Sequence, residues 1–363
     1  MKKTIEFASA MALAVLCSAS LPAGADDDRE LEPVPKWQDI TGLPGEEKGP
    51  GFKKLAKSFS GLGCGPATAG ELHCVLAPDE RTSVYFLTLK DGAVALGRQL
   101  PLLEVPGVPV NDPQSKVEGD FEAVARDGNT YWVFGSHSTR RDEVDEKKCY
   151  PEALRRHVFR FDVDATTGLP AAAFDADHIP AFVRHYDGLP KILSEVPDLA
   201  KVVDANICAD AGGFNIEGAT VGGGVVTLGL RAPLGAAGEA LAVTFSVARL
   251  EGAAGEAPVL HRLKLDGFGI RDLTAVPGGH LVLAGPPTSD DDDDKRPQST
   301  LWYWKSGGDD VTLIGSLAGT KKKTKPEALA VLAVDAAEWR VLVVGDGVRG
   351  GNPVEYRFPD PRR

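Results

Sequence analysis

The stretch GDFEAVARDGNTYWVFGSHS, residues 119–138, decides the fold, because related stretches recur three more times along the chain. The later copies are GFNIEGATVGGGVVTLGLRAP from Gly213, GIRDLTAVPGGHLVLAGPP from Gly269 and TKPEALAVLAVDAAEWRVLVVGDG from Thr324. Each copy has an acidic residue, a small or apolar pair, a turn and a short apolar strand. The aligned acids are spaced by 95, 55 and 55 residues and are Glu122, Glu217, Asp272 and Glu327. A fifth, weaker copy from Ser60 lacks the acid.

Strands of alternating pattern follow most copies at a regular offset. They are SVYFLTL from Ser83, HVFRFDV from His157, LAVTFSV from Leu241, STLWYW from Ser299 and PVEYRF from Pro353. Alternation with period two, rich in Val, Phe, Tyr and Trp, indicates half-buried β-strands. A third element, such as VLHRLKL from Val259, is typical of the outer strand of a four-stranded unit.

A repeat near 55 residues with about four strands predicts an all-β fold, a β-propeller of five or six four-stranded blades. A β-sandwich with chance similarity between its strands is the alternative. The longer 95-residue spacing leaves room for an irregular insertion or a degenerate blade near residues 165–212. We expect the propeller to occupy residues 55–363.

The amino terminus has the features of a secretory signal peptide over residues 1–25. Lys2 and Lys3 precede a short apolar run, and Ala23-Gly24-Ala25 forms a cleavage signature. Residues 26–54, rich in Pro, Gly and charge, are a candidate closing strand. The sequence therefore predicts a periplasmic or secreted protein without a membrane span.

Charge and cysteine content narrow the class of protein further. The formal net charge is −12, and loss of the signal peptide changes it to −13, which argues against nucleic acid and anionic membranes as partners. We expect a monomer that binds a small polar ligand or a protein. Four cysteines remain after cleavage, an even number that favours two disulfides in an oxidising compartment. Of three possible pairings, locality favours Cys64 with Cys74 and Cys149 with Cys208.

The repeated acids are the first candidate site, because the inner strand of each propeller blade lines a central channel. Glu122, Glu217, Asp272 and Glu327 would then converge at one channel mouth, with Asp120 and Asn215 two positions before their glutamates. Such carboxylates need a cation or a positive partner to coexist, and calcium suits an irregular set of oxygens. The alternative is that each acid pairs with a nearby cation, such as Arg271 or Lys325, or caps a turn.

The ends of the following strands supply a second candidate group. His137 lies beside Arg140 and Arg141 in GSHSTRR, and Arg231 lies in GLRAPL. A histidine near arginines can hold an anion such as a phosphate or a carboxylate. His137 is the candidate acid or base, although a hydrogen-bonded residue at a strand end is the alternative. The chain contains no GxSxG elbow, which argues against serine esterase chemistry.

The order of EAVARDGNTYWVFGSHS, RHVFRFDV, GGFNIEGATV, GLRAPL and GIRDLTAVPGG resembles the exported phytase-like domains, also described as "esterase-like activity of phytase". It is more similar to a related exported family of unknown function in which GSHS, NIEG and GLR motifs recur. The resemblance covers residues 60–347 and implies a propeller with Glu122 and Glu217 near its axis. GSHS stands where the phytase-like pattern would place a second acid.

Two functions follow from these features. The first is a propeller that binds a polar ligand, a metal or a partner at the channel mouth. The alternative is a calcium-dependent phosphoester hydrolase, in which the acids hold the metal, Arg140, Arg141 and Arg231 clamp the anion, and His137 moves a proton.

Overall fold

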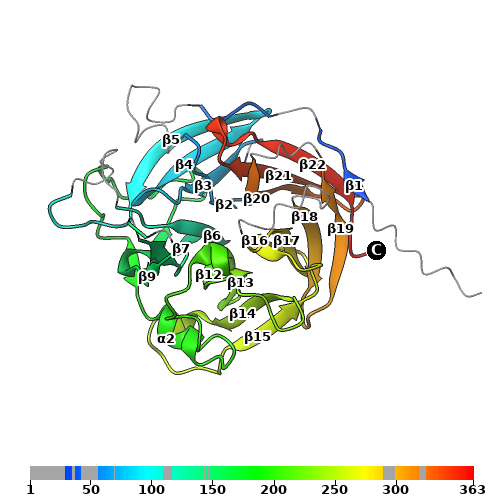
Figure 1. Ribbon diagram of the computed structural model, residues 1–363. Helices are drawn as coiled ribbons and strands as arrows, with labels where there is room; N and C mark the ends of the chain where they lie inside the picture. Colours follow the sequence, from blue (N-terminus) through cyan, green and yellow to red (C-terminus); the bar gives the residue numbers. More distant parts are fainter. Residues whose placement is uncertain are drawn as a thin grey trace, which may run out of the picture.

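The computed structural model describes residues 29–34, 37–41, 56–68, 70–108, 117–142, 144–145, 147–288, 299–318 and 324–363. These residues form a five-bladed β-propeller, which confirms the predicted fold class (Figure 1). The predicted signal peptide (residues 1–25) and most of residues 26–54 lie outside the described residues.

Each blade is an antiparallel meander that runs outward from the channel. Blade 1 comprises β2 (Gly61–Cys64), β3 (Leu72–Ala77), β4 (Ser83–Lys90) and β5 (Ala93–Pro101). Blade 2 comprises β6 (Phe121–Asp127), β7 (Thr130–Gly135), β10 (Val158–Asp162) and β11 (Arg184–Tyr186). Blade 3 comprises β12 (Asn215–Gly222), β13 (Val225–Ala232), β14 (Ala240–Ser246) and β15 (Val259–Leu263).

The last two blades depart slightly from the four-stranded plan. Blade 4 comprises β16 (Gly269–Val276), β17 (Gly279–Gly285), β18 (Thr300–Lys305) and β19 (Val311–Leu317). The short β1 (Glu30–Leu31) adds a parallel fifth strand at its outer edge. Blade 5 has only three strands in the described residues, β20 (Lys325–Val334), β21 (Glu338–Asp346) and β22 (Val354–Pro359). Pro33 bridges to Tyr356, so the segment that carries β1 contacts both blades.

In the part of the chain that the structure describes, the long spacing between the first two acids contains no sixth blade. β11 completes blade 2, and the short helix α2 (Leu189–Ser194) follows it. The other helical turns are α3 (Val247–Leu250), η1 (Ala153–Arg155), η2 (Ala209–Ala211) and η3 (Arg349–Gly351). None of the helices found in the described residues is long and apolar enough to cross a membrane.

The inner strands β2, β6, β12, β16 and β20 form a closed ring around the channel, in which β20 lies next to β2 (Figure 1). Glycines allow adjacent inner strands to approach closely. A Cβ on Gly61 would lie 2.9 Å from the Glu122 carbonyl oxygen, and one on Gly218 would lie 2.9 Å from the Leu273 nitrogen. Radial repetition leaves each blade with only short, protected sheet edges.

The hydrophobic core consists of five clusters, one between each pair of neighbouring blades. Between blades 4 and 5, for example, Leu281 and Leu283 pack with Trp339 and Tyr356. Every blade is therefore buried on both faces, which explains why the inner strands show apolar runs.

Two disulfides join the pairs predicted from the sequence. Cys64–Cys74 crosses the β2–β3 hairpin, and Cys149–Cys208 ties the small hairpin β8 (Thr139–Arg141) and β9 (Cys149–Pro151) to the segment before blade 3. Two disulfides are consistent with a periplasmic or extracellular protein.

Candidate functional site

A β-bulge stands at the same place in four of the five inner strands. Pairing with the second strand shifts by one residue at Glu122 in β6, Glu217 in β12, Arg271 in β16 and Glu327 in β20. A bulge leaves one residue outside the ladder and redirects its side chain. The acids Glu122, Glu217 and Glu327 therefore do occupy equivalent positions in their blades. That position is a β-bulge and not a regular strand position.

In blade 4 the bulge lies one residue before the acid that the sequence predicted at this position. We expected Asp272 to align with the three glutamates, but Arg271 occupies the bulge and Asp272 is the next residue in register with β17. The Asp272 carboxylate accepts hydrogen bonds from the backbone nitrogens of Leu273 and Leu329, each at 2.7 Å. It thus links β16 to β20 between blades. Burial raises the pKa of Asp272 well above its usual range, while the two N–H donors act in the opposite direction.

Arg271 neutralises two of the ring glutamates. Its Nη1 atom lies 3.0 Å from Oε2 of Glu217, and its Nη2 atom pairs with Glu327. The Arg271 side chain is only 5% exposed. Burial lowers the pKa of Arg271, and the Glu217 carboxylate opposes that shift. A guanidinium therefore lies between these two acids, as in the alternative to calcium that the sequence left open.

Glu217 is further occupied by two neighbours. Asn215 donates from Nδ2 to Oε1 at 2.9 Å, and Arg231 donates from Nη1 to the same oxygen at 3.1 Å. Arg231 also donates from Nε to the carbonyl oxygen of Pro287. The predicted ligand-binding Arg231 is therefore engaged within the protein.

Glu122 differs from the other ring acids. Nowhere in the described residues does its side chain form a hydrogen bond or an ion pair. Burial raises the pKa of Glu122 well above its usual range, and nearby Asp120, Glu217 and Asp79 raise it further. Glu122 should therefore carry a proton at pH values where an exposed glutamate has lost it.

Two more carboxyl groups, which the sequence analysis missed, belong to the same mouth. Asp79 follows β3, and Asp346 ends β21. Burial and then the neighbouring Asp346 and Asp120 raise the pKa of Asp79, and burial raises that of Asp346. The Oδ1 atom of Asp79 is buried without a hydrogen-bond partner in the described structure. Their sequence signal is weak: Asp79 lies just after a second strand and Asp346 is the last residue of one, at the end that faces this mouth.

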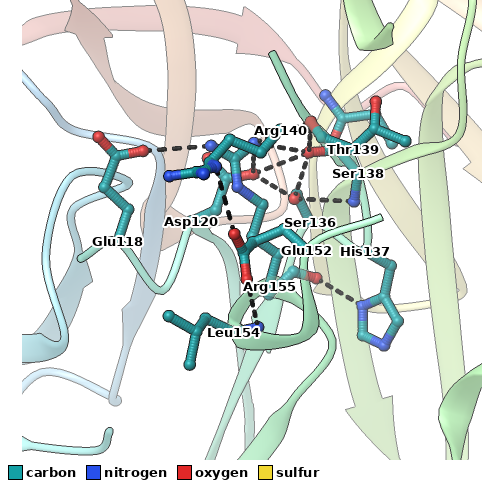
Figure 2. Close-up of polar contacts among 12 residues, drawn as sticks. Glu118, Asp120, Ser136, His137, Ser138, Thr139, Arg140, Glu152, Leu154 and Arg155 are labelled. Atoms are coloured by element: carbon teal, nitrogen blue, oxygen red, sulfur yellow. Dashed lines mark hydrogen bonds and ion pairs between the residues drawn. The ribbon is translucent and has the colours of Figure 1, made fainter. Parts of the chain in front are cut away.

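The SHS motif holds Asp120, as Figure 2 shows. Ser136 and Ser138 both donate to Oδ2 of Asp120, the second at 3.0 Å. Arg155 contacts the same oxygen at 3.1 Å and also reaches Glu118. Asp120 has a positive φ of 48°, an uncommon conformation outside glycine that this network holds. The motif therefore serves to position a carboxylate.

The predicted catalytic His137 is placed differently from its neighbours. Its side chain is buried, and Nδ1 lies 3.0 Å from the Gly135 carbonyl oxygen (Figure 2). Burial lowers the pKa of His137 to about 4, so the ring is neutral near pH 7. The His137 ring is therefore neutral and buried, and its role as an acid or a base stays a prediction.

Arg140 and Arg141 lie on the β8–β9 hairpin. Arg140 pairs with Glu152 at 3.3 Å (Figure 2), and Arg141 pairs with Asp210. Both predicted anion ligands are thus exposed and already paired with acids.

Buried polar atoms without partners cluster near the starts of the inner strands. The side chains of Ser60, Asn215 and Thr324 are 1%, 4% and 4% exposed, and their Oγ, Oδ1 and Oγ1 atoms form no hydrogen bond in the described structure. An unsatisfied buried polar atom costs about 1–3 kcal/mol. A bound molecule or ordered water would remove that cost.

The donor set does not fit the calcium site expected from the sequence. Among the residues that the structure describes, no three His, Cys, Asp or Glu side chains are arranged to hold a metal ion. Arg271 pairs with Glu217 and Glu327, and Asp272 points between blades.

Comparison of the sequence with known protein families gives a match that covers most of the chain. Residues 65–160 and 171–352 match the family described as "Protein of unknown function (DUF3616)". The chain belongs to this family. The match confirms the prediction of a family of unknown function, whereas a relation to phytase-like domains stays a prediction. A search of curated proteins gave no match.

Several solved structures are similar to this DUF3616 chain at low sequence identity. They include the catalytic domain of Coprinopsis cinerea GH62 alpha-L-arabinofuranosidase, with 11% identity and a TM-score of 0.44 over 89% of this chain and 96% of that chain. A GH43 beta-1,3-galactosidase has 11% identity and a TM-score of 0.43 over 90% of this chain. The DUF3616 chain spans 59% of that galactosidase's length. Similarity at this identity and TM-score carries no conclusion about this chain.

Proposed function

We propose that this DUF3616 propeller binds a neutral, hydroxyl-rich ligand, a sugar or a polyol, at the mouth lined by Asp79, Asp120, Glu122 and Asp346. The observation that carries the proposal is that Glu122 and Oδ1 of Asp79 have no partner within the described residues. A protonated carboxyl group both donates and accepts hydrogen bonds, as a hydroxyl group does. The mouth therefore offers the complement of a polyhydroxylated molecule.

The arginines of the mouth argue against an anionic ligand. Arg155 is engaged by Asp120 and Glu118, and Arg271 by two glutamates. Binding of a phosphate or a carboxylate needs cations that are free to contact it, and it would face the neighbouring acids. These contacts support a neutral ligand over a phosphoester.

The test is a binding panel with the purified protein. We expect neutral oligosaccharides to raise the Tm and to give a measurable Kd by calorimetry, while sugar phosphates do not. Asp79→Asn, which exchanges a carboxyl for an amide of similar size, should weaken saccharide binding about tenfold, or about 1.4 kcal/mol. Glu256→Gln is the matched control, because Glu256 is exposed and lies beyond the far end of β14.

The same panel tests the calcium hypothesis. If calcium alone raises the Tm and sugar phosphates bind more tightly than neutral sugars, the proposal of a neutral ligand is wrong. The calcium-dependent phosphoester hydrolase would then be favoured instead.

A further inference from the structure

We propose that the same mouth hydrolyses an acetal bond, the glycosidic bond of a neutral saccharide, with Glu122 as the acid that protonates the leaving oxygen. This inference rests on the proposed ligand binding and goes one step further, from binding to turnover. The residues that carry it are Glu122 and Asp120, two positions apart at the start of β6, together with the unpartnered polar atoms around them.

Glu122 and Asp120 have opposite environments although they are close in sequence. Asp120 accepts hydrogen bonds from Ser136 and Ser138 and forms an ion pair with Arg155. Glu122 lacks such contacts in the described part of the chain, and Asp120 is the charge that most strongly raises its pKa. Two carboxyl groups whose environments separate their protonation states can act as an acid and as a stabilising base.

An acid and a carboxylate can cleave several kinds of bond, and the charge of the mouth indicates which kind it would stabilise in the transition state. Acetal cleavage passes through a transition state with positive charge on the sugar ring, which a cluster of acids stabilises. Phosphoryl and acyl transfer develop negative charge and need free cations or a set of N–H donors. Arg155, Arg231 and Arg271 are all engaged. The electrostatics therefore favour an acetal.

A second observation, independent of the acids, supports a bound saccharide at this place. Asn215 is 96% buried with an unpartnered Oδ1 atom, and its Nδ2 atom is held by Glu217. Ser60 and Thr324 add unpartnered hydroxyl groups near the same ends of β2 and β20. A ligand rich in hydroxyl groups would donate to the amide oxygen and exchange hydrogen bonds with both hydroxyls.

The reaction balances with water as its only co-reactant. Glu122 gives its proton to the glycosidic oxygen as the carbon–oxygen bond breaks, and the Asp120 carboxylate faces the positive charge. Water then adds its oxygen to that carbon, and the proton it loses returns to the carboxylate cluster. One acetal and one water thus yield two hydroxyl-bearing products, with Glu122 protonated again.

The test measures turnover and binding on the same preparations. Wild-type protein is incubated with a panel of neutral 4-nitrophenyl glycosides and neutral oligosaccharides, alongside Glu122→Gln and the Glu256→Gln control. We expect hydrolysis by wild type and Glu256→Gln, and a fall in kcat of about 100-fold or more for Glu122→Gln, with Tm retained. The activity of the wild type should also decline as pH rises through the raised pKa of Glu122. The pH profile of Glu122→Gln should lack this decline.

The outcomes separate the two proposals. Saccharide binding without hydrolysis by the wild type would overturn the hydrolase and leave the ligand proposal standing. Hydrolysis that is unchanged in Glu122→Gln would show that the acid is another group and would also overturn it. The absence of both binding and hydrolysis would refute the ligand proposal itself.

Discussion

Replacing Arg271 by methionine tests whether this residue balances the charge of the channel. Methionine has a similar length and no charge, so Arg271→Met leaves Glu217 and Glu327 without their shared cation. Glu217 keeps its contacts with Arg231 and Asn215. Glu327 loses the ion pair that the structure shows for it, and the main cost should fall there.

The size of the effect follows from burial. Removing one partner of a buried ion pair costs about 3–5 kcal/mol, because the remaining charge stays buried and unpaired. Since Glu217 is partly compensated, we expect the low end, about 3 kcal/mol. With a urea m-value of about 3 kcal/mol/M for a protein of this size, the midpoint should fall by about 1 M.

Urea unfolding followed by circular dichroism is the assay, and two further variants make it specific. Arg271→Met with Glu327→Gln should recover most of the loss, since the unpaired charge is gone. Lys90→Met removes an exposed pair with Glu71 and should cost less than about 1 kcal/mol. A loss below 1 kcal/mol, or no recovery in the double variant, would refute the reasoning.

Two other acids give separate predictions for stability. Asp272→Asn should cost about 1–3 kcal/mol in urea unfolding, because its new NH₂ group would face one of the backbone N–H donors at Leu273 and Leu329; an unchanged midpoint would contradict the link between β16 and β20. Burial alone would raise the pKa of Glu355, but hydrogen bonds from Arg340, Trp37 and Arg357 lower it to about 2. A depressed pKa stabilises the fold above the unfolded value near 4.5 and loses that contribution as pH falls toward 2, so Glu355→Gln should flatten this limb of the stability–pH curve; an unchanged slope would show that Glu355 is not responsible.

The sequence predicted the parts of this fold that repeat and missed those that depend on one shifted residue. The inner strands and both disulfides follow from spacing, because each blade must place the same strands in the same order. The alignment of Asp272 with the glutamates is wrong, because matching acids by chemistry ignores the bulge that presents Arg271. Asp79 and Asp346 follow the second strands, where side chains vary from blade to blade, so no repeated pattern marked them.

The distribution of cations divides the channel mouth into two parts with different roles. Arg271 and Arg231 neutralise the acids of blades 3 and 5, Glu217 and Glu327, and a neutralised buried acid is part of the architecture. Glu122 has no such partner in the described protein, and desolvation and the neighbouring acids make its charged form costly. Natural proteins retain such costs where function needs the group. Substitution of the neutralised acids should therefore lower stability, whereas substitution of Glu122 should change ligand chemistry while the fold is kept.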